Sequence, residues 1–226
     1  MAVEGVYFMQ AEFWLQRWRE GRTGFHRDAP MPLLVQHWPA LHLAGGSRVL
    51  VPLCGKTLDM PWLAEQGYRV LGVELSPLAI GQFFDAQGLA PEKHETAMGT
   101  HHVAGNIEII QGDVFGLDDA TLAGCDAVYD RAAVIALPAA LRERYARDVY
   151  GRLRPGCRAL MITLEYPQHE MDGPPFSVDA GHVDALFGDA WQVDLLERRD
   201  ILASQPTFRD AGVTSLHTSV HRLLRA

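Results

Sequence analysis

Features of membrane, secreted and nucleic-acid-binding proteins are scarce in this sequence. It contains no apolar run approaching the roughly 20 residues that span a bilayer. Residues 1–16 contain neither Lys nor Arg, whereas a secretory signal starts with basic residues before an apolar core. The net charge of −8 opposes a general affinity for nucleic acid or anionic lipid. We therefore expect a soluble cytoplasmic protein with no nucleic-acid partner and no membrane partner.

Cysteine is also scarce. The three cysteines, Cys54, Cys125 and Cys157, are odd in number, widely spaced and set among apolar residues. A disulfide framework or a zinc site needs paired or closely spaced cysteines, so this pattern indicates reduced thiols. Cys54 could be proposed as a nucleophile, but no partner base is recognisable near it in the sequence.

Metal-ligand spacing is absent among the histidines as well. His101 and His102 are adjacent, so they cannot chelate a metal from one helix face, and no carboxylate partner stands beside them. We expect the polar stretch 91–105 to lie on the surface, and we expect no metal site.

The stretch 48–76 has the pattern of a strand, a tight turn, a helix and a second strand. Residues 48–53 are apolar without alternation, as in a central parallel strand buried on both faces. Thr57 is a plausible N-cap for a helix that ends before Gly67. The second strand, residues 68–75, carries Glu74 near its carboxyl end. This is half of a nucleotide-binding α/β fold, and a further helix is expected to start after the N-cap Ser76 and to stop at Gly88.

The turn in this stretch is poor in glycine, which limits the choice of nucleotide. Glu74 follows Leu53 by about 20 residues, the spacing at which a carboxylate accepts ribose hydroxyls. A dinucleotide-binding turn usually has three glycines, but here only Gly55 is present, and a Walker motif is excluded because Leu50 stands where its first glycine belongs. A cofactor without phosphate, most commonly S-adenosylmethionine, fits this turn. The alternative is a strand-helix-strand unit that binds no ligand.

The remaining pattern predicts a single α/β domain. A chain of 226 residues with 48% hydrophobic residues can bury one full core. Residues 1–8 show no periodicity and are expected to be an extension, followed by an N-terminal helical segment over 9–43, which includes a helix over 30–43, and a core over 47–226. We predict a seven-stranded, doubly wound α/β sandwich whose last strand is antiparallel. Beyond the two strands above, the predicted strands are residues 106–111, 125–135, 158–166, 191–202 and 213–224.

Two loops have the composition of pocket-covering segments. Residues 21–30 contain two glycines around Arg22 and Phe25, which is typical of a flexible lid that carries an aromatic side chain. Residues 167–179 are rich in proline and carry Phe176, which favours a stiff pocket wall.

Charged residues stand just after two predicted strands, where open parallel sheets bind their ligands. Asp113 could accept a hydrogen bond from an adenine amino group, or it could cap a turn. Asp130 and Arg131 could form a local salt bridge, or they could face the crevice.

Four motifs together resemble the thiopurine S-methyltransferase family, both its bacterial and its vertebrate members. They are FWLQRWREGRTGFH, VLVPLCGKTLDMPWLAEQGYRVLGVELS, YDRAAVIALP and GPPF, and the similarity covers nearly everything from Met9 onward. The resemblance implies a class I, Rossmann-like methyltransferase fold. It also implies transfer of a methyl group from S-adenosylmethionine to an aromatic or heterocyclic thiol, with S-adenosylhomocysteine as product. For bacterial members it further implies methylation of selenium or tellurium compounds as detoxification.

The resemblance also assigns roles to residues of this chain. Asp113 transfers by its backbone position only, and Arg209 lies within two residues of a second basic substrate residue of the family. The implied cofactor contacts are Trp18, Leu53, Glu74, Asp113, Val114 and Arg131, and the implied substrate contacts are Phe25, Pro175, Phe176 and Arg209.

Arg131 is the predicted catalytic residue. Methyl transfer from a sulfonium to a thiolate removes both charges, so it needs a dry, aligned site more than an acid or base. Positioning alone can supply roughly 7 to 11 kcal/mol. We expect Arg131 and Arg209 to stabilise the anionic substrate while Phe25 and Phe176 enclose its ring.

Two other functions compete with this hypothesis. A non-catalytic module that binds S-adenosylmethionine for regulation would not need the aromatic lid and the two arginines. A nicotinamide-dependent oxidoreductase is weakened by the missing glycines. We expect a monomer, because no exposed apolar stripe is apparent in the sequence.

Overall fold

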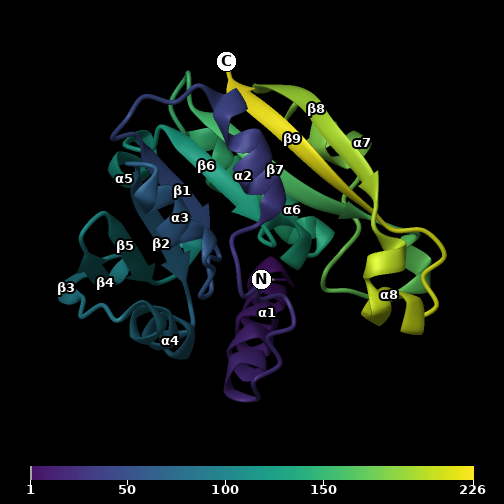
Figure 1. Cartoon of the computed structure of the whole chain (residues 1–226), viewed down its shortest axis with the longest axis horizontal. Coiled ribbons are helices and arrows are strands. Elements are labelled where there is room, and N and C mark those ends of the chain that lie inside the picture. The colour runs from purple at the N-terminus through teal and green to yellow at the C-terminus, as the bar shows by residue number, and fades with distance from the viewer. Residues whose placement is uncertain (1) are drawn as a thin grey trace.

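A computed structural model describes the backbone of residues 2–226 and the side chains of residues 11–226. Its centre is one mixed sheet of nine strands in the order β3-β4-β5-β2-β1-β6-β7-β9-β8 (Figure 1). The strands are β1 (Arg48–Pro52), β2 (Arg69–Glu74), β3 (Glu92–Thr96), β4 (Gly99–Ala104), β5 (Ile107–Gln111), β6 (Ala127–Arg131), β7 (Arg158–Glu165), β8 (Trp191–Asp200) and β9 (His217–Arg225).

Helices cover both faces of this sheet. The α-helices are α1 (Ala2–Arg19), α2 (Pro32–His37), α3 (Asp59–Glu65), α4 (Pro77–Gln87), α5 (Asp119–Ala123), α6 (Ala139–Asp148), α7 (Ala180–Phe187) and α8 (Pro206–Asp210). The short 3-10 helices are η1 (Trp38–Leu41), η2 (Val114–Gly116), η3 (Val134–Ala136), η4 (Tyr150–Arg152), η5 (Gln168–Glu170) and η6 (Leu202–Ser204).

Two hydrophobic cores lie on opposite faces of the sheet. One packs α2, η1, α3 and α4 against the sheet through Leu34, Met60 and Phe83. The other packs α5, α6 and α7 against the other face, and Tyr145 and Phe187 are fully buried in it. Burial on both faces explains why β1 and β2 are continuous apolar runs rather than alternating ones.

The predicted α/β fold class is confirmed, and all seven predicted strands form. Strands β5, β2, β1, β6 and β7 are parallel, and β9 runs antiparallel to both β7 and β8, as predicted for the last strand. After β5 the chain crosses to the other half of the sheet and continues there with β6. The point where the strand order reverses therefore lies between the neighbouring strands β1 and β6. Ligands bind outside the carboxyl ends of the strands at such a switch point.

The predicted strand count is wrong by one hairpin. Strands β3 and β4 lie within residues 91–105, for which we expected a surface position and no strand. His101 and His102 are buried, and the Nδ1 atom of His101 lies 2.6 Å from the carboxylate of Glu108 on β5. The carboxylate partner that the sequence did not reveal comes from the neighbouring strand. Among the described residues, no group of three or more His, Cys, Asp or Glu could hold a metal ion.

Helix boundaries follow the capping residues in part. Ser76 accepts a hydrogen bond from the backbone of Ala79 and caps α4, which ends at Gly88 in the left-handed conformation, both as predicted. Thr57 is not the N-cap of α3, because the helix starts two residues later and the Thr57 hydroxyl bonds to Asp59 instead.

The N-terminal part of the chain differs from the prediction in two places. Residues 2–8, expected to be an extension without assigned structure, form the first turns of α1, while residue 1 lies outside the described part. The helix expected over residues 30–43 is divided into α2 and η1. No helix of the described chain is both long and apolar enough to cross a bilayer.

A histidine inside the sheet predicts how stability depends on pH. His221 on β9 is fully buried, its Nδ1 atom has no hydrogen-bond partner among the described residues, and burial lowers its pKa from the usual 6.5. Below about pH 6.5 the unfolded chain therefore binds a proton that the native protein does not bind, so stability falls as the pH decreases. We expect His221→Leu to lose less stability than the wild type between pH 7.5 and 5.5 in urea unfolding.

The control for this prediction is the exposed His182, whose ring nitrogen pairs with Asp179. His182→Leu should follow the wild-type pH dependence. An unchanged slope in His221→Leu would show that other groups cause the decline.

Candidate active site

A cavity of about 640 Å³ opens at the carboxyl edge of the central strands, and α1 and the segment that follows it cover its mouth. Most of the residues predicted from the sequence meet here, although they come from separate parts of the chain. Those that line the cavity are Trp18, Phe25, Leu53, Glu74, Asp113, Val114, Arg131 and Pro175.

Two predicted substrate residues do not line this cavity. The ring of Phe176 lies near the guanidinium group of Arg142, 6.0 Å away, and Pro174 and Pro175 form the wall instead. Arg209 is exposed on α8, and its neighbour Phe208 faces the cavity. Which side chains of these two short segments face the cavity depends on their turns, and the sequence pattern did not predict those turns.

The carboxylate of Glu74 is fixed by backbone N–H groups from the turn after β1 and from the start of α4. Its carboxylate accepts hydrogen bonds from the backbone N–H groups of Gly55, at 2.9 Å, and Ser76, at 2.8 Å. Burial raises the pKa of Glu74, while these hydrogen bonds oppose that shift. A carboxylate has about four lone-pair positions, so each oxygen can still accept one ribose hydroxyl.

The turn beside Glu74 allows a ligand to approach the backbone closely. Leu53 and Gly55 both adopt positive φ, at 49° and 52°. A Cβ atom at Gly55 would lie 3.1 Å from the ring of Trp18, so glycine keeps this turn open beneath the indole. The positive φ of Leu53 is a strained conformation, and strain of this kind concentrates at ligand sites. The residues present therefore fit an adenosine cofactor without phosphate.

Asp113 acts as a cap in this structure. Its side chain accepts a hydrogen bond from the backbone N–H of Phe115 at 2.9 Å, at the start of η2. Asp113 and Val114 both line the cavity, so the capping role leaves the adenine contact open.

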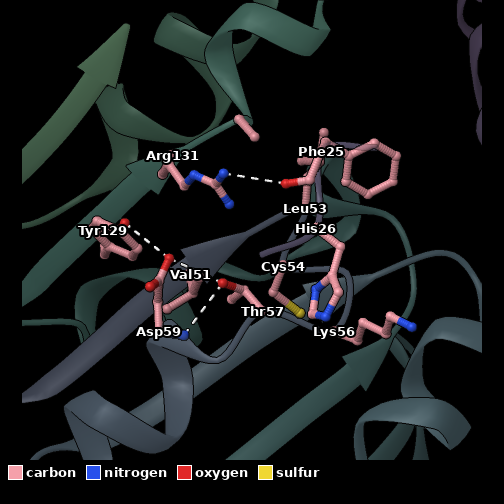
Figure 2. A pocket seen from close by; sticks show the side chains of 11 residues that line it. Phe25, His26, Val51, Leu53, Cys54, Lys56, Thr57, Asp59, Tyr129 and Arg131 are labelled. Carbon is pink, nitrogen blue, oxygen red and sulfur yellow. Dashed lines mark hydrogen bonds between the residues drawn. The ribbon is translucent and has the colours of Figure 1, made fainter. Parts of the chain in front are cut away.

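Arg131 does not pair with Asp130, so the local salt bridge that the sequence left open is absent. Asp130 is fully buried and accepts hydrogen bonds from the hydroxyls of Tyr145, at 2.8 Å, and Tyr150, at 3.0 Å. The backbone N–H of Val134 donates a third, at 3.1 Å. The guanidinium of Arg131 instead points toward the lid, where it donates to the carbonyl oxygen of Phe25 at 3.2 Å (Figure 2).

The lid is held at two points along the sheet edge. The ring of Phe25 packs edge to face on Trp14 and Trp18, with centroids 5.6 and 5.5 Å away. The guanidinium of Arg131 holds the middle of the lid through the carbonyl oxygen of Phe25. Just after the lid, the backbone N–H of Met31 donates to the buried carboxylate of Asp59 at 2.6 Å. These contacts place the aromatic side chain over the cavity.

A second, smaller pocket of about 30 Å³ lies between the lid and the β1 turn (Figure 2). Its polar side chains are ordered by Asp59, which accepts hydrogen bonds from the hydroxyls of Tyr129, at 3.0 Å, and Thr57, at 2.9 Å. This pocket holds at most a water-sized molecule. It supports the lid rather than forming a substrate site of its own.

Cys54 is not placed to act as a nucleophile. The thiol is buried, and burial, followed by the nearby charge of Glu74, raises its pKa well above the usual value. A thiol that stays protonated at neutral pH is a poor nucleophile.

Several cavity residues were not found from the sequence. Arg17 of α1 lines the cavity, and its buried Nε atom has no hydrogen-bond partner among the described residues. Arg199 reaches the cavity from β8, and no sequence motif marked it. The other unpredicted lining residues include Arg27, Met31, Leu33, Ile162, Met171, Ile201, Phe208 and Thr218.

Comparison with known proteins identifies relatives over nearly the whole chain. The sequence model of the family described as thiopurine S-methyltransferase (TPMT) matches residues 9–226. The chain is 65% identical over 217 residues to a thiopurine S-methyltransferase of Xanthomonas axonopodis pv. citri, covering 96% of this chain and 100% of that protein. It is 54% identical over 217 residues to one of Bordetella petrii, covering 96% of this chain and 99% of that protein.

Solved structures show the same fold at low sequence identity. The 1,6-didemethyltoxoflavin-N1-methyltransferase of Burkholderia thailandensis, solved with S-adenosylhomocysteine, aligns with a TM-score of 0.65 at 17% identity, covering 100% of this chain and 91% of that one. The N-methyltransferase NodS of Bradyrhizobium japonicum, also solved with S-adenosylhomocysteine, aligns with a TM-score of 0.61 at 15% identity, covering 93% of this chain and 97% of that one. The predicted class I methyltransferase fold is thereby confirmed.

Proposed function

Because the chain belongs to the thiopurine S-methyltransferase family, we propose that it methylates the sulfur of aromatic or heterocyclic thiols. It is a methyltransferase, and its cofactor is S-adenosylmethionine. The observation that supports a thiol acceptor is the composition of the cavity. The carboxylate of Glu74, which is suited to binding ribose, lines one side of the cavity. Arg131 lines the cavity as well, next to the aromatic lid residue Phe25.

The cofactor would be held by the residues around the first turn. Glu74 would accept the ribose hydroxyls, Asp113 and Val114 would border the adenine, and Trp18 and Leu53 would pack against the remainder. Each of these residues lines the cavity. When bound, S-adenosylmethionine supplies an electrophilic methyl group attached to a positively charged sulfur.

Arg131 would orient the acceptor for this transfer. Heteroaromatic thiols ionise appreciably near neutral pH, and a guanidinium group favours the thiolate form through its charge. The rings of Phe25 and Trp14 line the cavity and would exclude water around a bound acceptor, which would strengthen the attraction between Arg131 and the thiolate. No separate base is needed once the acceptor binds as a thiolate.

Removal of the Arg131 guanidinium should therefore reduce methyl transfer. We expect Arg131→Ala to lower kcat/KM for a heterocyclic thiol by tenfold or more, equivalent to about 1.4 kcal/mol. The rate is measured as S-adenosylhomocysteine formed from S-adenosylmethionine and 6-mercaptopurine. Because Arg131 does not pair with Asp130, the melting temperature should change little.

The control is Arg152→Ala, which removes an arginine paired with the exposed Asp119 away from the cavity. It should retain wild-type activity. If Arg131→Ala methylated the thiol at the wild-type rate, Arg131 would have no part in the mechanism.

We also propose reduced selenium and tellurium species as acceptors. They are soft nucleophiles like thiolates, so the same dry, aligned cavity would serve them. The similarity to bacterial members of the family motivates this second acceptor class. Methylselenol incubated with S-adenosylmethionine should yield dimethyl selenide, and its absence while thiols are methylated would exclude it.

The competing hypothesis is a regulatory module that binds S-adenosylmethionine without turnover. The protein would then bind S-adenosylhomocysteine but methylate no thiol in the assay above. We further propose that the chain works as a cytoplasmic monomer with one catalytic domain, in which residues 9–43 form the lid and substrate segment and residues 47–226 form the core.

A further inference from the structure

The acidic and the basic side chains that line the cavity lie on different sides of it. The two carboxylates that line it, Glu74 and Asp113, lie at or just past the carboxyl ends of β2 and β5, on the cofactor side. The acceptor side, which is built by the lid, the end of β6, β7, β8 and β9, carries only basic groups among the described residues, namely Arg27, Arg131 and Arg199, together with His26. Arg17 of α1 also lines the cavity. The rest of this acceptor side is mostly apolar. A cationic, partly apolar chamber of this kind favours an anionic aromatic ligand.

Arg199 faces this chamber because of a bulge in β8. The ladder between β8 and β9 pairs Leu195 with His221 and then Glu197 with Val220, so Leu196 is an extra residue in β8. One extra residue reverses which side chains face each side of a sheet. The bulge places Arg199 opposite Thr218, which also lines the cavity. Without the bulge, Arg198 would occupy that position.

The guanidinium of Arg199 is anchored through one edge only. One terminal nitrogen pairs with Glu197. That carboxylate is itself fixed by the Nε2 atoms of His37, at 2.8 Å, and Gln36, at 3.1 Å, both on α2. The remaining N–H groups of Arg199 have no hydrogen-bond partner among residues 11–226. Glu197 does not line the cavity, so the paired edge faces α2 and the unpaired edge is left for a ligand.

We propose that Arg199 binds a carboxylate carried by the methyl acceptor at a distance from its thiol. The inference rests on the thiol methyltransferase function proposed above, and it narrows the acceptors to aromatic thiols with a second, anionic group. Arg131 binds the thiolate next to the cofactor. Arg199 binds the carboxylate at the end of the cavity formed by β8. Guanidinium groups suit this role because their planar fork pairs with both oxygens of a carboxylate.

The test compares two thiols of nearly equal shape and different charge, 4-mercaptobenzoate and 4-mercaptobenzamide. The variants are Arg199→Met and, as a matched control, Arg198→Met. Arg198 and Arg199 are both exposed arginines on the same strand, with 47% and 55% of the side chain exposed, but Arg198 pairs with Glu165 and does not line the cavity. Formation of S-adenosylhomocysteine gives kcat and KM for each thiol.

We expect Arg199→Met to lower kcat/KM for 4-mercaptobenzoate by tenfold or more, mainly through KM, and to change that for 4-mercaptobenzamide by less than threefold. Arg198→Met should change neither value by more than twofold. Arg199→Lys, which keeps the charge but loses the planar fork, should fall between wild type and Arg199→Met for the benzoate.

Four results would overturn the inference. Equal losses for both thiols in Arg199→Met would indicate a structural role, and no loss for either would remove Arg199 from the site. Wild-type protein that methylates the benzamide but not the benzoate would contradict the anionic acceptor while leaving the thiol methyltransferase function intact. If the wild type methylates neither thiol nor 6-mercaptopurine, the proposed function itself fails, and this inference fails with it.

Discussion

Asp130→Ala should lower the free energy of unfolding by about 3 to 5 kcal/mol, the largest effect on stability that we expect from one substitution in this protein. The carboxylate has no exposed surface and accepts three hydrogen bonds. Its removal leaves the buried hydroxyls of Tyr145 and Tyr150 with no acceptor except each other, and each unsatisfied group costs about 1 to 3 kcal/mol. The melting temperature should fall by roughly 10 °C. Urea unfolding and differential scanning calorimetry measure both quantities.

Two further variants separate the buried network from surface charge. Tyr145→Phe removes one of the three donors and should cost about 1 kcal/mol. Asp119→Ala removes an exposed carboxylate paired with Arg152 and should cost less than about 0.5 kcal/mol. A loss below about 1 kcal/mol in Asp130→Ala would mean that Tyr145 and Tyr150 find other partners.

Glu74→Ala should weaken binding of S-adenosylhomocysteine by about 100-fold or more, equivalent to at least about 2.7 kcal/mol. Two ribose hydroxyls would lose a charged acceptor, and hydrogen bonds to charged groups contribute about 1.5 to 3 kcal/mol each. Isothermal titration calorimetry of wild type and variant measures the change in Kd. The substitution also releases the backbone N–H groups of Gly55 and Ser76, so the melting temperature of the variant must be measured beside its affinity.

Glu74→Gln distinguishes a local effect from damage to the turn. It keeps one oxygen as an acceptor and should weaken binding by about tenfold. Glu65→Ala, at the exposed end of α3, is the surface control and should bind as the wild type does. Wild-type affinity in Glu74→Ala would place the ribose contact on another residue.

The cofactor side of the site could be predicted because its geometry is local in sequence. The distance along the chain between the β1 turn and Glu74 is fixed by one helix and two strands, and both strands are continuous apolar runs. The cap at Ser76 and the stop at Gly88 were readable for the same reason, since each depends on residues within one helical turn.

The acceptor side could be predicted only in part, because it depends on pairing between distant segments. Arg199 faces the cavity through its register with Thr218 and a bulge that period-two alternation does not reveal. The β3–β4 hairpin was missed because β3 is exposed and polar throughout, and the partner of His101 lies on β5. The hydrogen-bond partners of Asp130 could not be predicted either, because Tyr145 and Tyr150 lie on the helices that follow β6.

The position of β9 between β7 and β8 bears on the order in which the protein assembles during synthesis. The ribosome produces β8 before β9, yet β8 joins the sheet only through β9. The strands that carry the cofactor side, β1, β2 and β5, are already available at that stage, and β2 pairs directly with the other two. Contacts between distant segments form late because their loop-closure cost must be met first. We therefore expect the nascent chain to complete its cofactor side first and to acquire its acceptor side only when β8 and β9 dock together as a hairpin.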